Sequence, residues 1–176
     1  MNIFIVDPDP TSAAQMLPDK HVCKMVLESA QMLSIVFSSH YWGIGEVMKV
    51  DGTPFKTAKG AFKNHPCTIW TRQSLFNYHW LGIHGLSLAK EYTYRYGKVH
   101  KSEAVIKWAM GLDVDTAFPS EDPTPFALAM PDEYKQKCVA SSYRAYYMGE
   151  KVRFAVWTRR EPPPWWHEYM NSLEVA

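Results

Sequence analysis

One segment of this sequence, residues 19–37 (DKHVCKMVLESAQMLSIVF), constrains the fold more than any other. Its apolar residues recur at the three- and four-residue spacing of an α-helix, so they predict a strip that faces a core. Small and apolar neighbours widen that strip toward one side. Asp19 follows Pro18 and is expected to be the N-cap residue of this helix. The strip consists of Val22, Val26, Leu33 and Val36, and the residues that widen it are Cys23, Leu27, Ala30 and Ser34.

The polar residues of the same segment fall on one stripe of the helix, which consists of His21, Lys24, Glu28 and Gln31. Steps of three or four residues separate them, so their side chains share one face. Two interpretations of this stripe are open. It is either a solvated face with an ordinary Lys24–Glu28 ion pair, or the functional face of the helix.

Length and composition are those of an ordinary globular protein. With 176 residues, of which 47% are apolar, the chain is long enough to bury one core, and we expect one domain over residues 1–176. The net charge of +1 provides no general basic excess of the kind that nucleic-acid-binding proteins often carry. A local basic face remains compatible with that total, because residues 49–63 contain four lysines and one aspartate.

Cysteine content and hydropathy suggest the compartment. Cys23, Cys67 and Cys138 cannot all pair with one another, and the first residues lack the features of a secretory signal. A reducing compartment is therefore expected, either the cytoplasm or, for a viral protein, the host cytoplasm. No apolar stretch approaches the roughly 20 residues needed to span a bilayer, so no membrane partner is expected.

The rest of the chain is predicted to form further helices joined by irregular segments. Residues 2–6 form at most one short strand, because two prolines follow directly. Asp9 or Thr11 is expected to cap a short helix that runs through Leu17, and Gly97 is expected to end the longest helix. The further helices are expected over residues 67–96, 102–112 and 132–148. The predicted fold class is thus mainly α, in one compact domain.

Two regions are candidates for contact with nucleic acid. His65 and Arg72 share a stripe at the start of the helix expected over 67–96, where backbone N–H groups and the helix dipole favour an anion. The long irregular segment 38–66 combines lysines with aromatic residues, which suits phosphate contact and base stacking. Buried loop anchors and an ordinary salt bridge of Arg72 are the structural alternatives. The aromatic residues of the segment are Tyr41, Trp42, Phe55 and Phe62.

The spacing Asp-x-His-x-x-Lys-x-x-x-Glu-x-x-Gln over residues 19–31, with His65-Pro66 downstream, resembles the pyrimidine-dimer DNA glycosylase family of the endonuclease V type and its looser bacterial and viral relatives. The resemblance covers about residues 1–100, and residues 101–176 are expected to be a helical extension that packs on them. It implies a compact helical fold with little or no sheet. It also implies binding of damaged or modified DNA, exposure of a nucleotide and cleavage of the N-glycosidic bond of a pyrimidine, with no cofactor or metal.

By this resemblance Glu28 is the catalytic carboxylate, because a carboxylate stabilises the positive charge that develops on the sugar. The endonuclease V enzymes attack with the α-amino group of an N-terminal threonine that removal of the initiator methionine exposes. This chain has Asn2 at that position, and asparagine is too large to favour methionine removal. The nucleophile is therefore open among the amine of Met1, the amine of Lys24 and a water molecule activated by Glu28.

The resemblance and the residue patterns together define the candidate site residues. The expected catalytic residues are Glu28, Lys24, His21 and Asn2, and the expected DNA or phosphate contacts are His65, Arg72, Lys20, Gln31 and Asn64.

Other functions remain as alternatives. Asp7, Asp9 and Thr11 after a possible strand resemble the nucleophile loop of haloacid-dehalogenase-type phosphohydrolases, and a nucleotide-processing enzyme is a related possibility. A non-enzymatic helical module could bind a protein partner, not identified by the sequence, through residues 162–166. A zinc site built on His21/Cys23 and His65/Cys67 is disfavoured, because residues two apart on a helix point about 200° apart.

Overall fold

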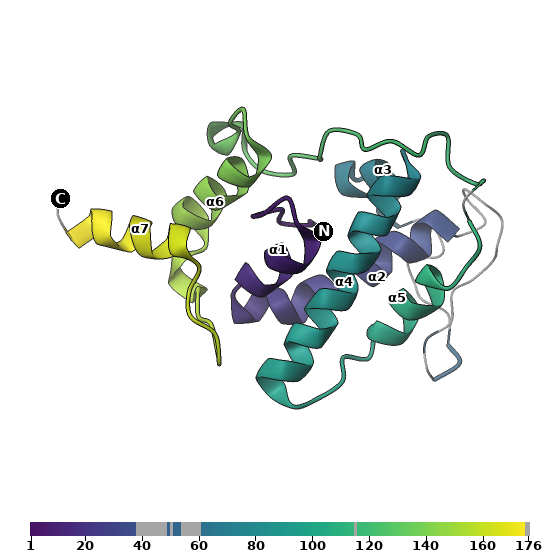
Figure 1. Cartoon of the computed structure of the whole chain (residues 1–176), viewed down its shortest axis with the longest axis horizontal. Helices are drawn as coiled ribbons and strands as arrows, with labels where there is room; N and C mark the ends of the chain where they lie inside the picture. The colour runs from purple at the N-terminus through teal and green to yellow at the C-terminus, as the bar shows by residue number, and fades with distance from the viewer. Residues whose placement is uncertain (38–48, 50, 54–60, 115, 175–176) are drawn as a thin grey trace.

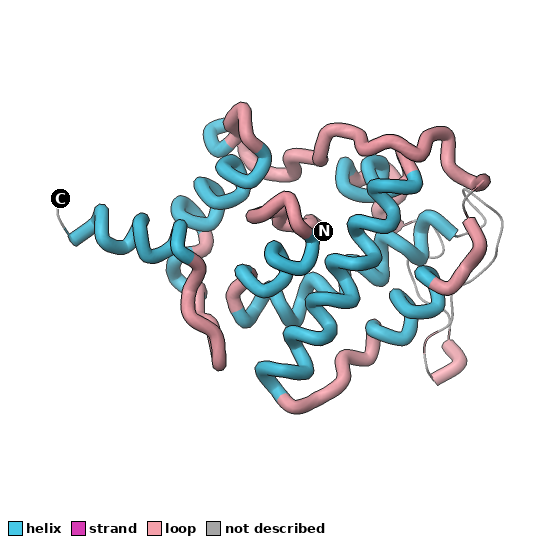
Figure 2. Tube along the Cα trace, in the orientation of Figure 1, coloured by secondary structure: helices cyan, strands magenta, loops and turns pink. Residues whose placement is uncertain are grey.

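The computed structural model describes residues 1–37, 49, 51–53, 61–114 and 116–174, and in this part of the chain the protein is helical (Figure 1). Figure 2 shows helices and connecting loops but no strand among these residues, which confirms the predicted fold class. The α-helices are α1 (Pro10–Met16), α2 (Asp19–Phe37), α3 (Pro66–Thr71), α4 (Leu75–Tyr96), α5 (Glu103–Met110), α6 (Val139–Glu150) and α7 (Pro164–Glu174). Two short 3₁₀ helices, η2 (Asp132–Tyr134) and η3 (Val152–Phe154), flank α6. None of the described helices is long and apolar enough to cross a lipid bilayer.

The core lies where α4 crosses α1, α2 and α5 (Figure 1). Gly85 of α4 allows the close approach to α2, because a Cβ atom at this position would lie 3.0 Å from Cβ of Ser29 and 2.9 Å from Cδ1 of Ile106. The four strip residues predicted for α2 are all fully buried. The buried side of α2 thus faces α4 at Ser29. This contact fixes the rotation of α2 about its own axis.

The prediction that Leu27 and Cys23 belong to the core was wrong. The Leu27 side chain is 39% exposed and Cys23 is half-buried. Because Ser29 is at the contact with α4, the core widens toward Met25 and Met32, which are buried on the opposite side of the strip. This rotation leaves Leu27 and Lys24 on the exposed side of α2.

The helix predicted over residues 67–96 is in fact two helices, α3 and α4. The Ser74 hydroxyl accepts a hydrogen bond from the N–H of Asn77 at 3.2 Å and so begins a new helix, while Arg72 is the C-cap residue of α3. The predicted end of α4 is correct, because Gly97 adopts the left-handed conformation with φ of 67° and its N–H donates to the carbonyl of Thr93.

One further expectation needs correction, and two are confirmed. Residues 132–148 form η2 and then α6 rather than one helix, and α7 is an additional helix that was not predicted. Residues 2–6 are buried and do not form a strand, which agrees with the expectation of at most one short strand there. The helix expected to end near Leu17 is confirmed as α1, and the Asp9 carboxylate caps it by accepting from the N–H of Ser12 at 2.7 Å.

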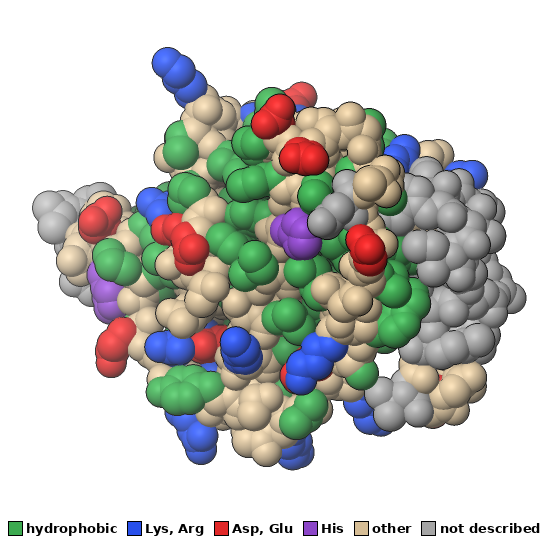
Figure 3. Space-filling model, turned by 45° about the vertical axis from the view of Figure 1, so that its right-hand side comes forward, with side chains coloured by type: hydrophobic (Ala, Val, Ile, Leu, Met, Phe, Trp, Pro, Cys, Tyr) green, Lys and Arg blue, Asp and Glu red, His purple; other side chains and the backbone are tan. Residues whose placement is uncertain are grey.

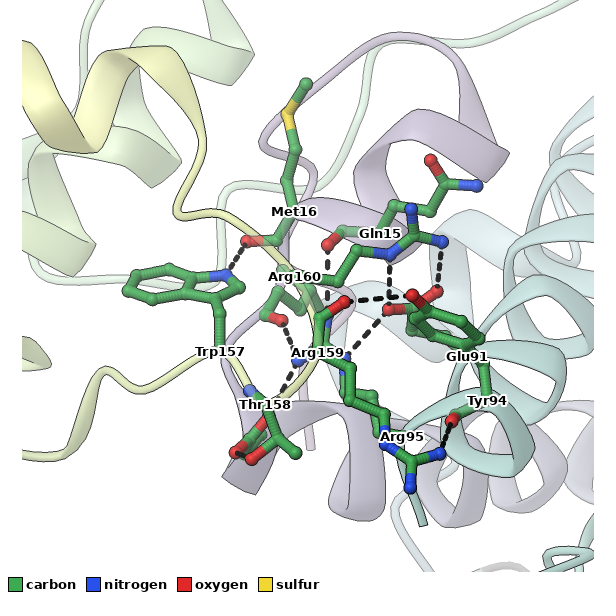
Figure 4. Close-up of polar contacts among 11 residues, drawn as sticks. Gln15, Met16, Glu91, Tyr94, Arg95, Trp157, Thr158, Arg159 and Arg160 are labelled. Carbon is green, nitrogen blue, oxygen red and sulfur yellow. Dashed lines mark hydrogen bonds and ion pairs between the residues drawn. The ribbon is translucent and has the colours of Figure 1, made fainter. Parts of the chain in front are cut away.

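A C-terminal strap, defined as residues 156–160, fastens α1, α2 and α4 together (Figure 4). Asp19 does not cap α2 as predicted. Its carboxylate instead accepts from the backbone N–H of Thr158 at 2.9 Å and pairs with Arg95 at 2.9 Å. Burial acts against the charged form, but the bonds from Thr158 and Arg95 outweigh it and lower the pKa of Asp19. The strap therefore fixes the first residue of α2.

Two arginines share one buried carboxylate in this network (Figure 4). Glu91 of α4 accepts from Arg95 at 2.8 Å and takes a two-point contact from Arg160 of the strap at 2.9 Å for each bond. The Arg95 side chain is fully buried and also donates to the carbonyl groups of Leu17 and Gln15. The guanidinium of Arg95 thus joins α1, α2 and α4 at one point.

Candidate active site

The Glu28 carboxylate lies at the point where the first two residues of the chain meet α2. The residue is 6% exposed, and its Oε2 atom accepts a hydrogen bond from the backbone N–H of Asn2 at 2.7 Å. Its Oε1 atom lies 3.7 Å from the amino group of Met1 and 3.3 Å from Nζ of Lys24. A buried carboxylate is thus surrounded by an amide, an α-amine and an exposed ammonium group.

The Met1 side chain holds the amino group in this position. It is 1% exposed and packs against the core, and the hydroxyl of Thr68 in α3 donates to its sulfur atom at 3.4 Å. The residue as a whole is only partly buried, so the exposed portion is its backbone end. The core therefore anchors Met1 by its side chain and leaves its amine accessible beside Glu28.

Asn2 is held by groups from the far end of the sequence. Its side-chain amide donates to the carbonyl of Ala129 at 2.7 Å, and its Oδ1 atom lies 3.0 Å from the hydroxyl of Tyr143 in α6. The backbone N–H of Ile3 also donates to this oxygen at 2.8 Å. The side chain of Asn2 is thus engaged by the protein, and its backbone N–H is the part that faces Glu28.

His21 lies on the same stripe of α2 as Lys24 and Glu28, as predicted, but it is buried. Its Nδ1 atom makes a hydrogen bond with the hydroxyl of Tyr147, and the ring of Phe4 lies 4.3 Å away between centroids. Burial, together with the smaller effect of the positive charges of Lys151 and Lys24, lowers the pKa of His21 to about 3. His21 is therefore neutral near pH 7.

His65 lies within electrostatic reach of this group. It is the N-cap residue of α3, where its Nδ1 atom accepts from the N–H of Cys67 at 3.2 Å. Burial lowers the pKa of His65, the amino group of Met1 lowers it further, and Glu28 acts in the opposite direction. The structure thus brings His65, Met1, Asn2, Lys24 and Glu28 together.

The remaining predicted contacts lie around this centre or away from it. Arg72 lies at the C-terminal end of the short helix α3, not at its start, and its guanidinium donates to the carbonyl of Lys63 at 3.1 Å. Asn64 is exposed in the turn that this bond orders, and Gln31 is half-buried on α2. Lys20 is exposed at the start of α2, with Nζ 5.2 Å from the ring centroid of Phe154. Tyr41, Trp42 and Phe55 lie outside the described residues.

Sequence reasoning did not assign the C-terminal residues of the site, namely Ala129, Tyr143 and Tyr147. Their contacts with Asn2 and His21 join residues more than 120 positions apart. The only sequence signal for them is the run of tyrosines over residues 143–147. Its helical spacing does not indicate what these tyrosines contact.

The structure does not support the phosphohydrolase alternative. Asp9 caps α1, and Asp7 lies 3.8 Å from Arg144. The described part of the chain contains no sheet on which the nucleophile loop of such enzymes would sit. In the same part, no three side chains of the metal-ligating types converge, and burial raises the pKa of the Cys67 thiol to about 12.

Acidic and basic side chains are mixed on the molecular surface. Figure 3 shows apolar side chains over much of one face, with both Lys or Arg and Asp or Glu side chains among them. This agrees with the net charge of +1. Attraction of an anion by this protein therefore depends on local groups such as those around Glu28 rather than on the field of the whole molecule.

Comparison with known proteins supplies the family. No curated protein and no solved structure matches the chain significantly. A family model described as pyrimidine dimer DNA glycosylase matches residues 1–104, which is more than half of the 176 residues and includes Met1, Glu28 and His65. This family acts in DNA repair on a DNA substrate, and it agrees with the all-helical fold. The chain therefore belongs to the pyrimidine dimer DNA glycosylase family.

Proposed function

We propose that this protein cleaves the N-glycosidic bond of a damaged or modified pyrimidine in DNA, with the α-amino group of Met1 as nucleophile and Glu28 as catalytic carboxylate. The observation that carries the proposal is the position of a buried carboxylate 3.7 Å from an accessible α-amine. The proposal applies to the polypeptide that begins at Met1. The family supports the reaction class, and the contacts of Glu28 support the roles of the two residues.

The amine of Met1 is a better nucleophile candidate than Lys24. The Lys24 side chain is 63% exposed and its ammonium group is paired with Glu28. Burial of the Met1 side chain orders the amine of Met1. The exposed side chain of Lys24 is not ordered in this way.

The chemistry follows from these two groups. The amine nitrogen attacks C1′ of the deoxyribose, and the bond from C1′ to the base nitrogen breaks with its electron pair leaving on the base, which then takes up a proton. Transfer of the remaining amine proton to O4′, as the C1′–O4′ bond opens, yields a Schiff base. Glu28 stabilises the positive charge that develops on the sugar during attack.

Borohydride trapping tests this proposal. The protein is incubated with duplex DNA that contains an ultraviolet dimer or an abasic site, reduced with borohydride and digested for peptide mass analysis. We expect a covalent adduct on the peptide that begins at Met1. Glu28→Gln should lower the rate of adduct formation by roughly 100-fold or more.

Two variants separate the candidate amines. Lys24→Ala should still form the adduct, whereas an uncleaved extension ahead of Met1 should abolish it. Glu103→Gln, which alters an ion pair with the exposed Lys107 on α5, serves as the matched carboxylate control and should react like the wild type. An adduct on Lys24 would contradict the role of Met1. Base release with no adduct would leave a glycosylase that uses water, and neither adduct nor base release would overturn the proposed function.

A further inference from the structure

The His21 imidazole is enclosed by aromatic rings from three separate parts of the chain. The centroids of Phe4, Tyr147 and Phe154 lie 4.3, 5.3 and 5.3 Å from that of His21. Phe4 is buried and adopts a φ of 57°, a conformation that costs a phenylalanine about 1 kcal/mol or more. The surrounding contacts thus impose an unfavourable backbone conformation that keeps this ring against His21.

The hydroxyl of Tyr147 determines which nitrogen of His21 carries the proton. Tyr147 is fully buried, and burial raises its pKa well above 10, so its hydroxyl keeps its proton. Among the described residues, the hydrogen-bond partner of this hydroxyl is Nδ1 of His21. A buried hydroxyl has to donate its proton to an acceptor. Nδ1 is therefore the acceptor, and the neutral imidazole carries its hydrogen on Nε2.

The Nε2–H group is the part of His21 that remains available. It has no acceptor among the described residues, and these residues do not enclose it completely. The charges of Lys24 and Lys151 both act on the imidazole. A neutral donor flanked by two ammonium groups suits an anionic acceptor that has no proton to donate.

The position of His21 relative to Glu28 indicates which part of a DNA strand it can contact. The two residues lie seven positions apart on one stripe of α2, which is two turns or about 10 Å along the helix. This separation is too large for contact with a sugar held at Glu28. It places the Nε2–H group beside the backbone that flanks that sugar.

We propose that Tyr147 is a positioning residue that holds His21 as an Nε2–H donor to a backbone phosphate next to the nucleotide bound at Glu28. This rests on the proposed function for the place of the nucleotide. Tyr147 lies outside residues 1–104, the part matched by the family model, so this contact is contributed by the C-terminal part of the chain.

Nitrogen NMR on the full-length ¹⁵N-labelled protein tests the first half of the proposal without any reaction. At pH 7 we expect His21 to show a protonated Nε2 and an unprotonated, hydrogen-bonded Nδ1. In Tyr147→Phe, which keeps the ring but removes the donor, the two tautomers should both be populated. Tyr169→Phe removes a tyrosine bond to the carbonyl of Met148 instead and should leave the His21 signals unchanged. A proton on Nδ1 in the wild type would overturn the proposal.

Binding to modified DNA tests the second half. The probe is a duplex with a tetrahydrofuran abasic analogue, which cannot form a Schiff base, in which the 5′ or 3′ flanking phosphate is replaced by a neutral methylphosphonate. His21→Leu should weaken binding to the unmodified duplex by roughly tenfold. One of the two methylphosphonates should weaken wild-type binding by a similar factor but leave His21→Leu unaffected. His21→Gln, whose amide can still donate near the same position, should recover part of the loss.

The outcomes separate this proposal from the proposed function. Additive losses from His21→Leu and both methylphosphonates would overturn the phosphate contact even if borohydride adducts form at Met1. The expected non-additivity together with neither adduct nor base release would support the contact while the glycosylase proposal fails. Thermal unfolding of each variant shows whether it is folded, and His21→Gln keeps the test decisive if Tyr147→Phe does not fold.

Discussion

The amide side chain of Asn2 is a structural group rather than a reacting one. Its Oδ1 atom accepts from the N–H of Ile3 and faces the hydroxyl of Tyr143, while its Nδ2 atom donates to the carbonyl of Ala129. From the sequence, Asn2 was expected among the catalytic residues. In the structure only its backbone N–H contacts Glu28, and any residue except proline provides that group.

Asn2→Ala is therefore expected to act mainly on stability. It leaves the buried N–H of Ile3 without its acceptor and the half-buried carbonyl of Ala129 without a donor, so the free energy of unfolding should fall by about 2 kcal/mol. Urea denaturation followed by circular dichroism measures this change. Asn64→Ala, at an exposed position, should change the same quantity by less than about 0.5 kcal/mol. Equal effects of the two substitutions would show that the Asn2 contacts add no stability.

At the scale of elements, the orientation of α2 depends on contacts at its first residue and at its middle. Gly85 of α4 sets the approach at Ser29, and the strap fixes Asp19. Glu91 lies at the centre of the strap network because it neutralises both Arg95 and Arg160 (Figure 4). The buried ion pairs and their hydrogen bonds outweigh the effect of burial, so the pKa of Glu91 is lowered.

Removal of this carboxylate provides a test at the same scale. Glu91→Ala leaves the buried guanidinium of Arg95 without one of its carboxylate partners, and we expect a loss of about 3 kcal/mol in the free energy of unfolding. Glu103→Ala removes another pair with the same four-residue spacing, Glu103–Lys107, whose lysine side chain is 65% exposed. That loss should stay below about 1 kcal/mol. Similar losses in chemical denaturation would contradict the role of burial.

For the whole molecule, two buried histidines make stability depend on pH. The pKa of His21 is lowered to about 3, and burial is the main reason that the pKa of His84 is lowered to about 4. In the unfolded chain both imidazoles take up a proton below about pH 6.5, whereas in the folded protein they remain neutral until much lower pH. The unfolded state therefore binds more protons between pH 6.5 and 4. The free energy of unfolding should fall as the pH falls through this window, by up to about 1.4 kcal/mol per pH unit for each histidine.

Urea titrations at pH 7.5, 6.0 and 5.0 measure this dependence. His84→Asn keeps a donor near the carbonyl of Pro10 and should make the decline between pH 6.0 and 5.0 shallower by about 1.4 kcal/mol. His167→Asn, at an exposed position on α7, should leave the decline unchanged. A decline in His84→Asn as steep as in the wild type would contradict this assignment.

How much of the molecule is predictable from its sequence depends on the distance over which each contact acts. The face shared by His21, Lys24 and Glu28 follows from helical spacing alone, and so do the buried residues of the α2 strip. The exposure of Leu27 does not, because it depends on which side of α2 faces Gly85. The Ser74 cap was present in the sequence, but the apolar residues Trp70 and Leu75 near it favoured one continuous helix. The partners of Asn2 and His21 are more than 120 residues away, and no local pattern identifies them.

The attachment of Asn2 to Ala129 and Tyr143 also has a consequence for protein synthesis. Asn2 is made at the start of synthesis, but the residues that hold its side chain are made more than 120 residues later. At typical elongation rates of about 5–20 residues per second, this interval lasts roughly seven to thirty seconds. Until then the side chain of Asn2 lacks these partners, although α2 and the Thr68 contact of Met1 have already been made. Translation thus sets the order in which this site is completed, because a nascent chain carries Met1, Asn2 and Glu28 before it can fix the side chain of Asn2.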